Sequence, residues 1–142
     1  MKSIAIFIAT LLVPALSFGQ LFKFRAYKTV IGSIINDAYK PSDSSVSNYL
    51  VLLNLDKDQV VLYANQQEDK YDIVKVDQKF YDYDSSAILP MVGVNEKGQK
   101  FNIYLTLYHK GRTDTKYSVV SVGKIMIAYG SFRIEAFLRQ ND

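Results

Sequence analysis

The chain has 142 residues, no cysteine, no tryptophan and a formal net charge of +3, with 49% hydrophobic and 22% charged residues. Without cysteine it has neither disulfides nor thiolate sites for metals or redox chemistry. The basic residues are scattered along the chain rather than concentrated, so no nucleic-acid partner is expected.

The first predicted element is a secretory signal peptide over residues 1–19. A positively charged start and an apolar run over residues 4–13 precede small side chains at a cleavage site between Gly19 and Gln20. The run is too short to span a membrane, and no cysteine follows the cleavage site to carry a lipid anchor. We therefore expect an exported protein, periplasmic or secreted, with no stable membrane anchor after cleavage. Its mature part, residues 20–142, is expected to be a single antiparallel β domain.

About eight antiparallel strands are predicted from the alternation of apolar residues. In residues 22–26, 101–107 and 132–138 apolar side chains occupy every second position, so each strand has one buried and one wet face. Residues 49–55 are apolar on both faces, as expected for a strand covered on both sides. The predicted strands are 21–31, 49–55, 59–64, 70–76, 86–94, 99–108, 117–129 (with a break allowed at Gly123) and 132–138.

Turn residues separate these strands. Gly98 and Gly130 are suited to a positive φ in two hairpins, the second with the type II′ pattern, and residues 56–58 form a charged turn. The fold class is therefore all-β, a small antiparallel barrel or sandwich, of which a lipocalin-like barrel is one form. Residues 30–39 could form a short helical turn at most. Residues 40–47 and 109–114 are predicted to be polar loops.

The segments that carry the hairpin pattern are SFGQ at 17–20, FKFRAY at 22–27, VLLNLDKDQVVLY at 51–63, YDIVKV at 71–76 and VNEKGQKFNIYLTLY at 94–108. Together they resemble the small signal-peptide-bearing all-β exported proteins of Bacteroidota, a group of unassigned function. The resemblance implies export and a β fold, and it brings no catalytic residues with it.

No catalytic or metal-binding constellation stands out. His109, the only histidine, has no visible nucleophile or orienting acid beside it. A calcium loop would start at Asp82, but Ala87 and Gly93 stand where an EF-hand needs glycine and a bidentate glutamate. Two interpretations of this segment remain: an irregular Ca²⁺ site at Asp82 and Asp84, or simply a solvated loop. No acidic pair, phosphate-binding loop or serine elbow is recognisable, so we expect no enzyme activity, no metal and no cofactor.

The 11 tyrosines are the one unusual feature of the composition. Tyr27, Tyr104 and Tyr108 fall on polar faces of predicted strands, while Tyr81 and Tyr83 stand between two strands. Exposed rings form stacking platforms for sugars or peptides, although tyrosine is also common on the wet side of a sheet. These five tyrosines are the candidate ligand-binding residues.

Two functions fit these expectations. The first is an exported non-enzymatic binding or interaction module for an unknown protein, peptide or glycan. The alternative is a lipocalin-like carrier whose barrel encloses a small apolar ligand, although the chain lacks the Gly-x-Trp pattern of the first lipocalin strand. A filled centre favours the module and a hollow apolar centre favours the carrier.

Overall fold

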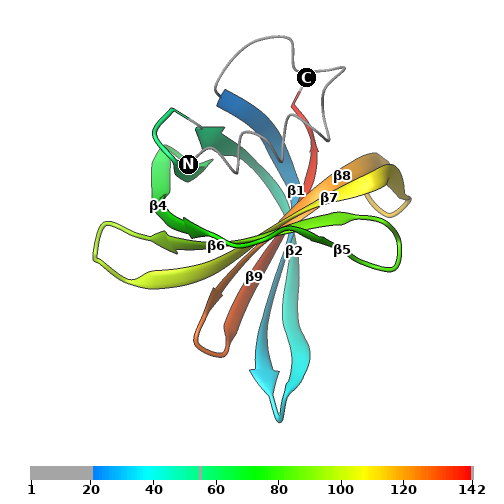
Figure 1. Ribbon diagram of the computed structural model, residues 1–142. Coiled ribbons are helices and arrows are strands. Elements are labelled where there is room, and N and C mark those ends of the chain that lie inside the picture. Colours follow the sequence, from blue (N-terminus) through cyan, green and yellow to red (C-terminus); the bar gives the residue numbers. More distant parts are fainter. Residues whose placement is uncertain (1–20, 55, 142) are drawn as a thin grey trace.

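The computed structural model describes residues 21–54 and 56–141, which form one antiparallel sheet of nine strands (Figure 1). The predicted signal peptide lies outside the described residues. Within the described part of the chain, no helix is long and apolar enough to cross a membrane. The strands are β1 (Leu21–Ile35), β2 (Ala38–Asn54), β3 (Gln59–Ala64), β4 (Gln67–Val76), β5 (Phe80–Tyr81), β6 (Ala87–Val94), β7 (Lys100–Asp114), β8 (Val119–Tyr129) and β9 (Phe132–Gln140).

Eight of these strands close into a barrel. β1 to β4 form one meander and β6 to β9 form another, and the two are joined by the pairing of β4 with β6 and of β9 with β1. β5 pairs with β6 alone and is an extra strand outside the ring. The predicted all-β class is confirmed, in the form of a small antiparallel barrel.

Apolar side chains fill the centre of the barrel. They come from alternate positions of each strand, as the sequence predicts: Phe22, Phe24 and Ala26 face inwards on β1 and are at most 8% exposed. An eight-stranded barrel has an interior just wide enough for side chains to fill. Removing this surface from water is the main stabilising contribution, at roughly 25 cal/mol per Å². The largest fully buried apolar side chains are Leu53, Leu89, Ile103, Leu105, Ile125, Leu138, Val51 and Val60.

The first hairpin is longer than predicted. The helical turn predicted within 30–39 and the loop predicted over 40–47 are both wrong, because residues 30–35 and 38–47 belong to the paired strands β1 and β2. Asn36 and Asp37 join them with φ angles of 51° and 61°, the left-handed pair that a two-residue type I′ turn requires. The serine-rich composition suggested a loop, but hydrogen bonding to β1 holds these residues extended. The hairpin projects beyond the barrel, in blue and cyan in Figure 1.

β7 is also longer than predicted, so the expected loop over residues 109–114 is wrong. The strand passes its predicted end because residues 108–111 form a bulge, after which pairing with β8 resumes at Arg112. A bulge tolerates extra residues within a paired strand and turns side chains in new directions. β8 is continuous through Gly123, the position at which a break in the predicted strand was considered.

The shorter turns occur where they were predicted. Asp56, Lys57 and Asp58 lie in the turn between β2 and β3. Gly98 and Gly130 have φ angles of 77° and 57°, which glycine adopts without strain. These turns join consecutive strands of each meander and so fix their antiparallel order.

Gly123→Ala is expected to destabilise the barrel by about 2–3 kcal/mol, because the added methyl group would be driven into the backbone carbonyl of Thr106 on β7. The matched change Gly130→Ala meets no atom and strains only a left-handed φ, at a cost of about 1 kcal/mol. Urea unfolding measures both values. Equal stability of the two variants would contradict the close packing of β7 on β8.

Candidate functional site

A groove on the outside of the barrel gathers polar and aromatic side chains. Its volume is about 270 Å³, below the roughly 300–1,000 Å³ of pockets that enclose drug-sized ligands, so it suits a small chemical unit. β1, β7, β8 and β9 supply its walls together with the turn after β7. We call it the outer groove; it is lined by Tyr27, Lys28, Tyr108, Arg112, Thr113, Asp114, Thr115, Ser121 and Phe137.

Asp114 at the end of β7 is held by two residues of β1. The Tyr27 hydroxyl donates a hydrogen bond to its Oδ2 at 3.0 Å, and Lys28 Nζ lies 3.3 Å from the same oxygen. Two consecutive residues of one strand reach the same carboxylate because the pairing register shifts between Ala26 and Lys28. The bulge on β1 therefore builds this part of the groove.

The contacts at Asp114 shift two pKa values. Burial raises the pKa of Tyr27 from 10.0 to about 12, and the hydrogen bond to the Asp114 carboxylate adds to the shift. Desolvation acts to raise the pKa of Asp114, but hydrogen bonds from Tyr27 and Lys28 outweigh it and lower that pKa below its ordinary value. At neutral pH the phenol is therefore protonated and the carboxylate is charged.

Cations cover the rings of the groove. The Arg112 guanidinium carbon lies 3.8 Å from the centroid of the Tyr108 ring. On β9, Phe137 lies below Lys28 Nζ, which is 4.3 Å from its ring centroid. Each such contact contributes about 0.5–1 kcal/mol at an exposed site. These rings thus hold cations in place at the groove.

Tyr27 and Tyr108 are therefore not the exposed stacking rings that the sequence suggested. Tyr27 is only 6% exposed and packs edge-on against Tyr117, with ring centroids 5.5 Å apart. Tyr108 is half-buried beneath Arg112. Both belong to the groove, but as its supporting parts.

Open rings lie on a neighbouring segment that we call the aromatic loop, residues 80–84, which consists of β5 and the turn after it. Tyr83 is 95% exposed and Tyr81 is 55% exposed. Asp82 fixes the loop, since its Oδ1 accepts hydrogen bonds from the backbone N–H of Asp84 at 2.9 Å and of Ser86 at 3.0 Å. Within residues 21–54 and 56–141, no group of three His, Cys, Asp or Glu side chains is placed to hold a metal ion.

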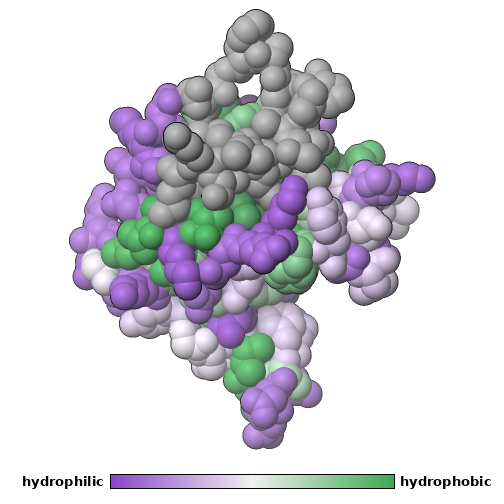
Figure 2. Space-filling view, viewed as in Figure 1, coloured by the Kyte–Doolittle hydropathy of each residue, from purple (hydrophilic) through white to green (hydrophobic). Residues whose placement is uncertain are grey.

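Arg112 joins the loop to the groove. While its guanidinium lies over Tyr108, its Nη2 donates hydrogen bonds to Asp84 Oδ2 at 3.0 Å and to Ser86 Oγ at 3.3 Å. β5 and the β7–β8 hairpin accordingly project on the same side of the barrel (Figure 1). On that side, hydrophilic, intermediate and hydrophobic residues are mixed (Figure 2). We call the outer groove and the aromatic loop together the tyrosine flank.

The tyrosine flank unites four of the five predicted tyrosines. The fifth, Tyr104, is half-buried on β7 between Pro90 of β6 and Met126 of β8, away from the groove. His109 is exposed on the β7 bulge. Sequence reasoning missed the other seven groove residues, because the pairing of distant strands brings them together and no local pattern marks them: Lys28, Arg112, Thr113, Asp114, Thr115, Ser121 and Phe137.

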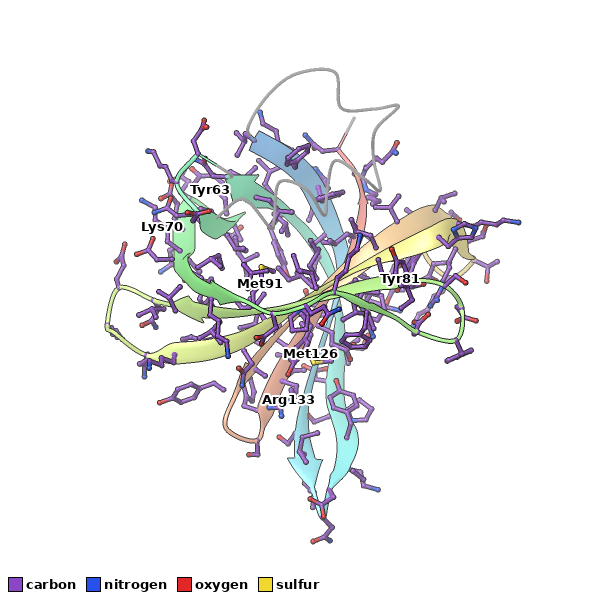
Figure 3. The ribbon with its side chains drawn as sticks, in the orientation of Figure 1. Tyr63, Lys70, Tyr81, Met91, Met126 and Arg133 are labelled. Atoms are coloured by element: carbon purple, nitrogen blue, oxygen red, sulfur yellow. The ribbon has the colours of Figure 1, made fainter. Side chains whose placement is uncertain are left out.

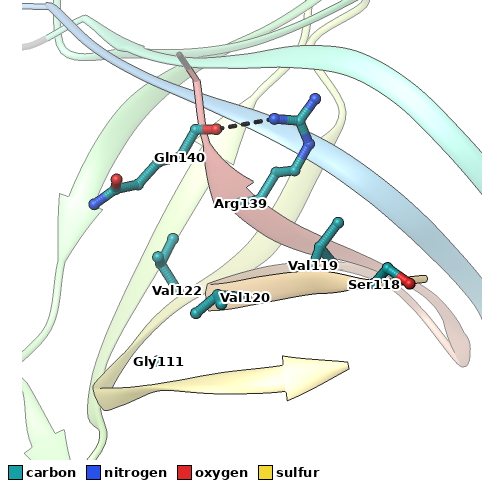
Figure 4. A pocket seen from close by; sticks show the side chains of 7 residues that line it. All are labelled: Gly111, Ser118, Val119, Val120, Val122, Arg139 and Gln140. Carbon is teal, nitrogen blue, oxygen red and sulfur yellow. Dashed lines mark hydrogen bonds between the residues drawn. The ribbon is translucent and has the colours of Figure 1, made fainter. Parts of the chain in front are cut away.

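A larger depression of about 650 Å³ lies between the start of β8 and the end of β9 (Figure 4). Three valines of β8 line it, together with four other residues: Val119, Val120 and Val122, with Gly111, Ser118, Arg139 and Gln140. Arg139 is the one charged residue of the lining, and its guanidinium already donates to the carbonyl oxygen of Gln140 at 3.2 Å. This depression offers less chemistry than the tyrosine flank.

Tyr27→Phe is expected to flatten the alkaline loss of stability. Because the folded-state pKa of about 12 exceeds the unfolded value of 10.0, the contribution of Tyr27 is complete below pH 10 and is lost as the pH rises towards 12. Burial also raises the pKa of Tyr39 to about 12, so part of the slope remains in the variant. Urea unfolding across this range measures the slope, and an unchanged slope would contradict the buried position of Tyr27.

Arg112→Gln is expected to loosen the aromatic loop with little loss of global stability. The ion pair with Asp84 is exposed, so its removal costs at most about 1 kcal/mol. Hydrogen–deuterium exchange should show faster exchange of the Asp84 and Ser86 amides. Arg139→Gln, which touches no part of the loop, is the matched control. Unchanged protection in the Arg112 variant would refute the role of this side chain.

Comparisons with known proteins add no assignment to this geometry. No protein-family model matches the chain, and no curated protein or solved structure matches it. The function must be argued from the barrel and the tyrosine flank themselves.

Proposed function

We propose that this chain is an exported, non-enzymatic binding module that holds its ligand on the outside of the barrel, at the tyrosine flank. The observation that carries the proposal is Tyr83, a large aromatic side chain that is 95% exposed on a loop fixed by hydrogen bonds. Tyrosine and arginine are the side chains most often found at the energetic centres of binding surfaces. Here Arg112 is hydrogen-bonded to Asp84, the residue that follows Tyr83 in the chain.

The loop is ordered before any ligand arrives. Asp82 binds two backbone amides and Arg112 binds the next carboxylate, at Asp84. A surface that is already fixed loses less conformational entropy on binding than a mobile one. An exposed ring on a fixed loop is therefore suited to contact a partner.

The groups in the groove favour binding over catalysis. Asp114, with its lowered pKa and its hydrogen bonds, is a weak general base. Tyr27, with a pKa near 12, gives up its proton poorly at neutral pH. The imidazole of His109 is exposed on the bulge rather than directed at a nucleophile in the groove. These side chains position and bind more readily than they transfer protons.

The carrier alternative receives less support. A carrier needs an open space inside the barrel, but the described strands place fully buried apolar side chains there, among them Leu53, Ile103 and Leu138. Those side chains contact one another in a single core cluster. Native mass spectrometry of the protein purified from its own periplasm is expected to give the mass of the polypeptide alone. An additional mass lost on denaturation would favour the carrier.

Tyr83→Ala is expected to weaken ligand binding about tenfold or more without lowering stability, because truncation of a central aromatic contact typically costs 2 kcal/mol or more. The purified protein and the variant are compared on arrays of glycans and peptides. Tyr63→Ala is the matched control: Tyr63 is 38% exposed on β3 and lies on the opposite side of the view from Tyr81 (Figure 3). Binding that the two variants reduce equally would contradict the proposed site.

A further inference from the structure

We propose that the ligand of the tyrosine flank is an acidic saccharide, a sugar chain that carries carboxylate or sulfate groups. This inference rests on the proposed function and narrows its ligand class. It combines three features of the flank: carboxylates that are already neutralised, lysines at the rim that remain available, and open rings beside hydroxyl groups.

The carboxylates around the groove are paired. Asp114 contacts Lys28 at 3.3 Å and Asp84 contacts Arg112 at 3.0 Å. The third, Glu135, is 7% exposed and contacts Lys124 at 2.9 Å. Each of these three acids thus has its own cation, while the carboxylate of Asp82 in the aromatic loop accepts hydrogen bonds from two backbone amides. An approaching anion therefore meets less repulsion than it would from bare carboxylates.

Two further lysines are each within two residues of a groove-lining residue in the chain, a position that we call the rim of the groove. Lys110 lies on the bulge of β7 and Lys116 in the turn that follows this strand, and both are exposed. Neither occurs among the ion pairs of the described residues, which leaves their charges available to a ligand. Lys116 Nζ is 5.6 Å from the ring centroid of Tyr117, which helps to hold it near the groove. The rim therefore carries a positive charge beyond that needed to balance the acids.

The remaining groups suit a sugar. Tyr81 and Tyr83 expose their rings, and the apolar C–H face of a sugar ring can pack against an aromatic face. Thr113 and Thr115 line the groove and are exposed, so their hydroxyl groups can donate to and accept from sugar hydroxyls. A groove of about 270 Å³ has room for one small unit of a longer chain. A repeating acidic saccharide would place its anion at the rim and its ring at the loop.

Three polymers with one backbone test the inference: dextran, carboxymethyl dextran and dextran sulfate. Binding to the mature protein is measured by affinity electrophoresis and calorimetry at two salt concentrations. We expect the carboxylate or the sulfate polymer to bind at least tenfold more tightly than neutral dextran, and the difference between these two arms identifies the preferred anion. Equal affinity for all three would overturn the inference.

Matched variants distinguish a general effect of protein charge from binding at the tyrosine flank. Lys110→Ala combined with Lys116→Ala should weaken binding of the acidic polymer at least fivefold. Lys57→Ala combined with Lys97→Ala removes the same charge from the β2–β3 and β6–β7 turns and should leave affinity within about twofold. The β6–β7 turn lies on the opposite side of the view from the β7–β8 hairpin (Figure 1). Equal loss in both double variants would mean non-specific attraction and overturn the inference.

Tyr83→Ala distinguishes a failure of the acidic-saccharide inference from a failure of the proposed binding function. Loss of acidic-polymer binding in this variant supports both the saccharide and the site. If no dextran binds, but another array ligand binds in a Tyr83-dependent way, the acidic saccharide is wrong and the binding module stands. If Tyr83→Ala changes no binding at all, both the inference and the proposed function fail.

Discussion

Closure of the barrel is the constraint on which the rest of the molecule depends. The pairing of β9 with β1 and of β4 with β6 turns two meanders into a ring, and inward-facing residues from both then meet in one core. The same β9–β1 pairing brings Phe137 next to Lys28 and so forms one wall of the outer groove. Stability and the candidate site therefore share a single origin.

The barrel could be largely predicted from the sequence because its signals are local. Alternation along residues 101–107 specifies an inner face, and Gly98 and Gly130 mark turns by their conformational freedom. The first hairpin escaped prediction because composition and pairing disagree there. Serine, proline and aspartate at 40–47 suggest a loop, yet β1 supplies a partner strand and the Asn36–Asp37 turn sets the register.

The candidate site could be predicted only in part, because its geometry comes from contacts between distant residues. Of the five tyrosines singled out from the sequence, Tyr81 and Tyr83 have exposed rings. Nothing in the local sequence indicates that Tyr27 would donate to Asp114, 87 residues away, or that a bulge would keep Arg112 within a strand. Exposure at the flank is decided by packing between strands, which alternation alone does not specify.

The projecting first hairpin has a consequence for the molecule in a crowded compartment. β2 pairs with β3 only along residues 50–54, so the outer edge of its residues 38–48 has no strand beside it among the described residues. An uncovered edge invites pairing with another chain. Here Pro41 lacks a backbone donor, and Lys40 and Asp43 bring charge to the edge. The residues that made this segment resemble a loop thus also discourage the barrel from joining its neighbours into a continuous sheet.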